Sequence, residues 1–148
     1  MIKDLDVLLL EDMRLRLGKE FITRALPDYA LHFAYATNYE QLLARLEENG
    51  GIGLALVDMD TDIQSVLGIR FHTNMAAHYP ATVINESNPS CVKVLVSDYG
   101  RREREDPHFY PRELYQVIFD RTELDLNRAD LPNTIQQFRE KLKGHGIP

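Results

Sequence analysis

Short runs of consecutive apolar residues, separated by amphipathic segments, constrain the fold of this chain most strongly. A strand with one face in water alternates apolar and polar residues, whereas a strand in a parallel sheet covered on both faces is apolar throughout. The runs in this chain are of the second kind. The predicted strands are DVLLL (6–10), ALHFAYA (30–36), IGLALV (52–57), VKVLV (92–96) and LYQVIF (114–119). Strands alternating with helices predict an α/β fold of the doubly wound class, with a parallel five-stranded sheet and right-handed crossovers.

Helical patterns lie between these runs. The first helix is expected within residues 14–26, with Leu15, Ile22 and Leu26 on one face and Phe21 beside them. In the second, over 37–51, Thr37 and Glu40 have the spacing of a capping box, and the buried stripe is expected to hold Leu42, Leu43 and Leu46. The last is expected over 133–144, ending at Gly144, with Ile135, Phe138 and Leu142 aligned. Residues 63–79 are a further expected helix, while 79–91 and 98–114 contain turn residues and prolines and resist assignment.

Composition limits the classes of protein to which the chain can belong. A length of 148 residues suits a single domain over 1–148. The net charge of −6, without a basic cluster, makes a nucleic-acid partner unexpected. The single Cys91 excludes an internal disulfide and a cysteine-based zinc site, and it fits a reducing cytoplasm. No apolar run approaches the roughly 20 residues of a membrane span, so membrane insertion is not expected.

Polar residues follow several of the predicted strands at the point where each strand ends. In an open parallel sheet, ligands bind at the carboxyl ends of the strands. Carboxylates gathered at that edge are oxygen ligands of the kind that Mg²⁺ prefers, and the five histidines show no metal-binding spacing. The residues at these ends are Glu11 and Asp12 after the first strand, Asp58 after the third, Ser97 and Asp98 after the fourth, and Asp120 and Arg121 after the fifth.

This order resembles the receiver domain of bacterial two-component response regulators. The likeness lies in VLLLED (7–12), LALVD (54–58) and VLVS (94–97). The resemblance implies a flavodoxin-like domain that is phosphorylated on Asp58 and signals by docking to another protein. It also implies that Ser97 hydrogen-bonds the phosphoryl oxygens. The implied Mg²⁺ ligands are Glu11, Asp12, Asp58 and the backbone carbonyl of Asp60.

The same resemblance implies the partners and the place of action. A histidine kinase or phosphotransfer protein would supply the phosphoryl group, and a downstream effector would read it, in the cytoplasm. A homodimer is compatible with this role. We expect a phosphoacceptor domain rather than a turnover enzyme, and no bound organic cofactor.

One family feature is missing from the chain. Receivers carry a lysine, usually followed by proline, after the fifth strand, where this chain has VIFDR (117–121). Arg121 could supply the positive charge, although a guanidinium does not replace an ammonium group freely. Tyr115 is a candidate for the aromatic residue that the family often has on this strand. The missing lysine favours an alternative, a pseudo-receiver that keeps the fold for phosphorylation-independent protein contacts.

Two enzyme families also place aspartates in this spacing after a strand. Haloacid-dehalogenase-type phosphatases use DxDx[TV], but here Thr61 falls one position early and Asp62 takes its place. A Toprim-like, metal-dependent nucleic-acid enzyme would use Glu11 with Asp58 and Asp60, although the chain lacks the glycine that normally follows the glutamate. Asp60 and Asp62 also suit the first turn of a helix, with no further role.

A cluster of carboxylates without a bound cation is expected to cost stability, because like charges repel one another. We therefore expect Asp58→Ala to raise the melting temperature slightly in metal-free buffer.

Overall fold

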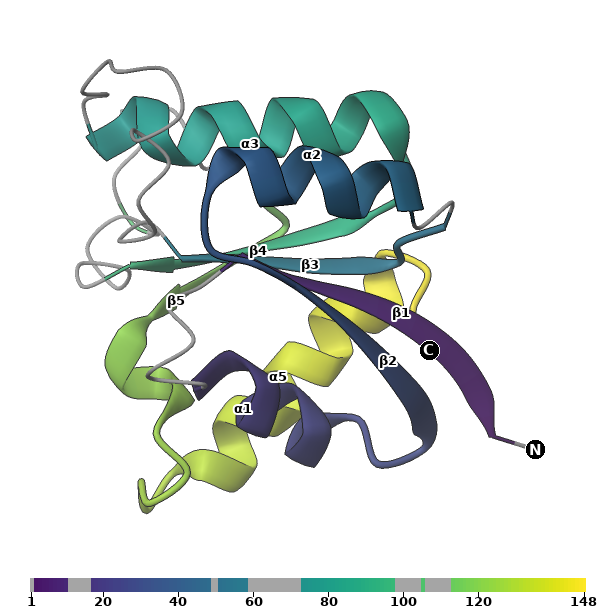
Figure 1. Ribbon diagram of the computed structural model, residues 1–148. Coiled ribbons are helices and arrows are strands. Elements are labelled where there is room, and N and C mark those ends of the chain that lie inside the picture. Colours follow the sequence, from purple (N-terminus) through teal and green to yellow (C-terminus); the bar gives the residue numbers. More distant parts are fainter. Residues whose placement is uncertain (1, 11–16, 49–50, 59–72, 98–104, 106–112) are drawn as a thin grey trace.

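The computed structural model describes residues 2–10, 17–48, 51–58, 73–97, 105 and 113–148 (Figure 1). Helices and strands alternate along most of the chain. In chain order they are β1 (Lys3–Leu10), α1 (Leu17–Ala25), β2 (Tyr29–Ala36), α2 (Tyr39–Glu48), β3 (Leu54–Asp58), α3 (Thr73–Ser87), β4 (Val92–Ser97), β5 (Val117–Asp120), the 3₁₀ helix η2 (Arg121–Leu124) and α5 (Leu131–Gly144).

The described strands form one parallel sheet in the order β2-β1-β3-β4-β5. This is a flavodoxin-like arrangement, with β3 at the centre, and it confirms the predicted fold class. Every residue of β3 and β4 is buried, which explains why these segments are apolar without alternation. Within the described residues, no helix has the length and apolar character needed to cross a membrane.

Helices cover both faces of the sheet (Figure 1). On one face α1 and α5 bury Leu5, Val7 and Leu9 of β1 together with Phe119 of β5, and on the other α2 and α3 bury Leu8 and Leu10. Three phenylalanines join α1, β5 and α5. Their ring centroids lie 5.3 Å apart for Phe21 and Phe119, 5.4 Å for Phe21 and Phe138, and 5.5 Å for Phe119 and Phe138. These edge and tilted contacts fix the edge strand β5 against two helices.

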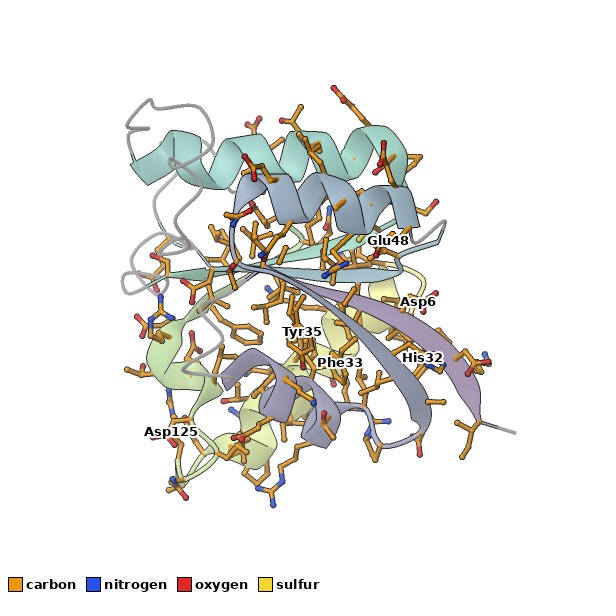
Figure 2. The ribbon with its side chains drawn as sticks, in the orientation of Figure 1. Asp6, His32, Phe33, Tyr35, Glu48 and Asp125 are labelled. Carbon is orange, nitrogen blue, oxygen red and sulfur yellow. The ribbon has the colours of Figure 1, made fainter. Side chains whose placement is uncertain are left out.

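The edge strand β2 carries aromatic residues on its α1 side, where Figure 2 shows Phe33 and Tyr35. Their rings stack with centroids 6.4 Å apart. The ammonium group of Lys19 lies 5.6 Å from the centroid of Phe33 and 5.9 Å from that of Tyr35, which is within cation–π range. Both rings are only partly buried, because β2 lies at the margin of the sheet.

The start of α2 differs from the prediction by one residue. The side chain of Asn38, not that of Thr37, accepts the backbone N–H of Gln41, at 2.9 Å. The side chain of Gln41 in turn accepts the backbone N–H of Thr37 at 2.8 Å, so Gln41 takes the part that Glu40 was expected to play. The predicted buried stripe is also only partly correct, because Leu42 is fully buried and Leu46 half-buried, whereas Leu43 is exposed.

Helix α3 extends further along the chain than the sequence predicts. Residues 63–72 of the predicted helix lie outside the described residues, but α3 continues through Pro80 to Ser87, across a stretch that we expected to contain turns. Pro80, Ala81 and Ile84 are buried against the sheet. Packing therefore outweighs the poor helix propensity of proline in this segment.

The last strand begins later than predicted, at Val117 rather than at residue 114. Before it, Gln116 contacts β4 twice: its side chain accepts the backbone N–H of Lys93 at 2.7 Å, and its own N–H donates to the Lys93 carbonyl at 3.0 Å. Tyr115 is buried but lies before β5, so it is not a residue of that strand. The last helix ends at Gly144 as predicted but begins two residues earlier, at Leu131.

Candidate functional site

Asp58 is the last residue of the central strand β3. It is 4% exposed, an unusual degree of burial for an aspartate. Asp58 pairs in register with Val96 of β4, and the preceding Val57 pairs with Leu10, the last residue of β1. Strands β1, β3 and β4 therefore end at the same edge of the sheet, as the predicted site requires.

The Asp58 carboxylate is held by Arg121, which directly follows β5. Arg121 Nη1 donates to Oδ2 at 2.6 Å, and Nη2 donates to Oδ1 at 2.7 Å. The two parallel bonds form a bidentate ion pair, the geometry for which a guanidinium is suited and an ammonium is not. Arg121 is itself largely buried, with 17% of its side chain exposed. The charge of Asp58 is thus matched by a neighbouring cation inside the protein.

A capping box at the start of η2 fixes the backbone from which Arg121 extends. Asp120 is the N-cap residue, and its side chain accepts the backbone N–H of Thr122 at 3.1 Å and the Thr122 hydroxyl at 2.8 Å. Glu123 returns the contact by accepting the backbone N–H of Asp120 at 2.9 Å. Asp120 was expected at this strand end, but its capping box with Glu123 was not predicted, although the D-x-x-E spacing of residues 120–123 is a recognisable capping signal.

Ser97 lies at the same edge. It is the last residue of β4, is 3% exposed, and pairs in register with Asp120 of β5. Its neighbour Val96 pairs with Asp58. The structure therefore brings three of the predicted site residues, Asp58, Ser97 and Arg121, to one edge of the sheet.

The remaining predicted metal ligands, Glu11, Asp12 and Asp60, lie outside the described residues. In the part of the chain that the structure describes, no group of three or more His, Cys, Asp or Glu side chains could hold a metal ion. Asp58 is the one member of the predicted set that can be placed. Each carboxylate oxygen has two lone pairs, so the contacts of Asp58 with Arg121 do not by themselves exclude a cation.

The ion pair changes the electrostatic interpretation of Asp58. The expected gain in stability on Asp58→Ala assumed a carboxylate surrounded by like charges. Arg121 instead neutralises Asp58 at hydrogen-bonding distance, and removing the carboxylate would leave a buried guanidinium without this partner. Loss of one member of a buried pair is destabilising. The expected sign of this substitution is therefore reversed.

Three groups with a raised pKa lie away from this edge. Burial raises the pKa of the Cys91 thiol to about 12 and also raises the pKa of the Tyr115 hydroxyl. A hydrogen bond to Asp4, at 2.9 Å, raises the pKa of the exposed His32. Cys91 precedes β4, at the opposite end of that strand from Ser97. These shifts give no reason to assign chemistry to the three groups.

Comparison with solved structures finds the same type of fold at low sequence identity. A chain in the crystal structure of an adenylate cyclase from Rhodopirellula baltica superposes with a TM-score of 0.52 and 11% sequence identity. The match covers 97% of this chain and 91% of that chain. At this identity the similarity shows the α/β fold alone. No protein-family model and no curated protein matches the sequence.

Proposed function

We propose that the chain is a receiver-like signalling domain in which Asp58 accepts a phosphoryl group. The observation that supports this most directly is the pairing of the buried Asp58, at the end of β3, with Arg121 after β5. Receiver domains carry a lysine after the fifth strand that contacts the phosphoryl group, and Arg121 occupies the corresponding place in this chain. Ser97 lies at the same edge, where the resemblance requires a hydroxyl group.

The chemistry proposed for Asp58 is a nucleophilic displacement at phosphorus. A carboxylate oxygen forms a bond to the phosphorus of the donor, and the bond from phosphorus to the leaving group breaks, with its electron pair going to that group. Arg121 would release one carboxylate oxygen and contact the added phosphoryl oxygens, and the Ser97 hydroxyl would donate a hydrogen bond to them. Fixed positive charge at this position stabilises the developing negative charge.

The proposal also includes a divalent cation, most of whose predicted ligands lie outside the described residues. Glu11, Asp12, Asp58 and the carbonyl of Asp60 would hold Mg²⁺, which would neutralise the incoming charge. The proposed partners are a histidine kinase or phosphotransfer protein as donor and a downstream effector as reader, and the proposed location is the cytoplasm. The domain would act as a phosphoacceptor rather than as a turnover enzyme.

The bidentate geometry also favours a second candidate, a pseudo-receiver that acts without phosphorylation. Arg121 occupies both oxygens of Asp58, so a phosphoryl donor must displace at least one of two short charge-assisted bonds. If Arg121 never released Asp58, the domain would act only as a protein-interaction module. A Toprim-like enzyme would use Asp58 as a metal ligand, as the receiver would, so this pairing does not separate those two candidates.

Treatment with acetyl phosphate and Mg²⁺, followed by intact-mass analysis, tests the leading proposal. We expect a mass increase of one phosphoryl group that is absent in Asp58→Asn. The matched control is Asp28→Asn, which removes an exposed aspartate paired with Arg139 at 3.2 Å and should leave uptake unchanged. Uptake that persists in Asp58→Asn contradicts the assignment of Asp58.

The phosphoryl mimic beryllofluoride separates the alternatives, with binding measured by calorimetry. Absence of phosphoryl uptake, of beryllofluoride binding and of Mg²⁺ binding favours the pseudo-receiver. Mg²⁺ binding without either signal favours the Toprim-like enzyme.

A further inference from the structure

Two acidic residues flank Arg121 in sequence: Asp120, the last residue of β5 and N-cap of η2, and Glu123 within η2. We infer that the Asp120–Glu123 capping box is a positioning device that holds the Arg121 guanidinium in register with both oxygens of Asp58. Glu123 would thereby set how well Arg121 is placed to contact an added phosphoryl group. The effect of Glu123 on phosphoryl transfer rests on the proposed function of Asp58, whereas its effect on the ion pair does not.

The first step is that η2 is fixed at both ends. At its start, Asp120 belongs to β5 and pairs with Ser97 of β4, so the sheet sets where the helix begins. At its end, Leu124 is 1% exposed and belongs to the hydrophobic cluster that contains Phe119 and Phe138. Between these anchors, Arg121 is the first residue of the helix and has little freedom in where its side chain begins.

The second step is that the capping contacts determine the backbone around Arg121. Asp120 has extended backbone angles, φ −72° and ψ 140°, as expected of an N-cap residue, so the chain turns sharply into η2 at Arg121. The bond from Asp120 N–H to Glu123 Oε1, at 2.9 Å, closes this turn across Arg121. Without it, the turn would lose one of the contacts that hold its shape.

The third step concerns the precision that a bidentate pair requires. Both nitrogens of Arg121 lie within 2.7 Å of their carboxylate oxygens, so a small rotation of η2 would lengthen at least one bond. Two parallel bonds demand a defined orientation of the guanidinium, unlike the contact of a single ammonium group. A rigid support for the backbone of Arg121 therefore matters more here than it would for a lysine.

Solution NMR of the arginine side chains tests the positioning role directly and without any phosphoryl donor. In Glu123→Ala, we expect hydrogen exchange of the Arg121 Nη–H protons to accelerate about fivefold, comparable with the usual cost of losing a helix cap. In Glu123→Gln, the amide oxygen can still accept the Asp120 N–H, so exchange should stay close to that of the unaltered protein. Glu47→Ala, which removes an exposed glutamate on α2, is the matched control and should change nothing.

Arg45 provides an internal reference in the same spectra. It lies on α2 and contacts Glu48 and the Tyr35 carbonyl, so a general loosening of the protein would affect Arg45 as well as Arg121. Acceleration confined to Arg121 and reversed by Glu123→Gln supports positioning. Unchanged exchange at Arg121 in Glu123→Ala overturns it, as does equal acceleration at Arg45.

One further variant keeps the test decisive. If Glu123→Ala does not fold, Thr122→Val removes only the 2.8 Å hydroxyl bond to Asp120 and should accelerate Arg121 exchange to a smaller extent. Unchanged exchange in Thr122→Val would then overturn the inference.

Beryllofluoride binding connects this device to the proposed function. Glu123→Ala should weaken binding about fivefold when Arg121 is present and have no effect in an Arg121→Gln background, because the two residues would act as one unit. If exchange at Arg121 responds but no variant binds beryllofluoride, the positioning role stands and the phosphoryl proposal fails.

Discussion

Substitution of Asp58 provides a quantitative test of the ion pair at the end of β3. The Asp58 side chain is 5% exposed and that of Arg121 is 17% exposed, so Asp58→Ala would leave a guanidinium largely buried without this carboxylate. Removing one partner of a buried pair typically costs about 3–5 kcal/mol. Because Arg121 keeps some contact with water, we expect the lower end of this range, about 3 kcal/mol. For a domain of this size, that loss lowers the melting temperature by about 6–12 °C.

The assay is thermal and urea denaturation in metal-free buffer, followed by circular dichroism. Asp28→Ala is the control, because it breaks an exposed ion pair with Arg139 and should change the free energy of unfolding by less than about 1 kcal/mol. The double variant Asp58→Leu with Arg121→Met should recover most of the loss, since replacing both members of a buried pair with apolar residues is often neutral.

A rise in the melting temperature on Asp58→Ala would refute this reasoning and restore the view of Asp58 as a carboxylate under repulsion from its neighbours. A double variant as unstable as the single variant would show that Asp58 and Arg121 are not energetically coupled.

Three further predictions concern residues away from the site. Asp4→Asn should lower the pKa of His32 towards 6.5, as measured by NMR titration. Because the folded-state pKa of His32 is raised, the Asp4–His32 pair stabilises the protein fully below pH 6.5. This stabilisation is lost as the pH rises through the folded-state pKa. With its pKa raised to about 12, Cys91 should react with thiol reagents near neutral pH only as fast as the protein unfolds. Gly53→Ala would place a methyl group 2.7 Å from a leucine methyl of β1 and should destabilise the protein by about 1–3 kcal/mol, whereas Gly51→Ala, with nothing within 4 Å, should be close to neutral in the same denaturation assay.

The strands were predictable from the sequence because buried strands consist mainly of apolar residues. Buried β3 reads as an apolar run up to Asp58, and β4 is apolar apart from Lys93 and Ser97. The order of the polar residues after the strands was enough to predict that Asp58, Ser97 and Arg121 share an edge. On the same basis, Arg121 was predicted to lie at this edge, as a residue that could supply the charge of the missing lysine. Its bidentate contact with Asp58 was not predicted, since it depends on side-chain geometry across 63 residues of sequence.

The errors arose where local sequence signals compete with packing. Turn-forming residues around 85–90 suggested a loop, but burial of Ala81 and Ile84 carries α3 through Pro80. At α2, Thr37 and Asn38 are both good caps, and the choice of Asn38 depends on where the chain leaves β2. The acidic residues 11, 12 and 60 fall outside the described residues, so the predicted cation site remains a hypothesis.

The distance in sequence between the two charges of the ion pair has a consequence for how the protein assembles. If the central strands form first, Asp58 would enter a dry environment before its counter-charge arrives, because Arg121 lies in η2, after the last strand. Contacts that close long loops form slowly. The unpaired charge would therefore raise the free energy of a chain whose last strand has not docked. Completion of the sheet would become more cooperative. During synthesis on the ribosome, this carboxylate would acquire its cation only after most of the polypeptide had emerged.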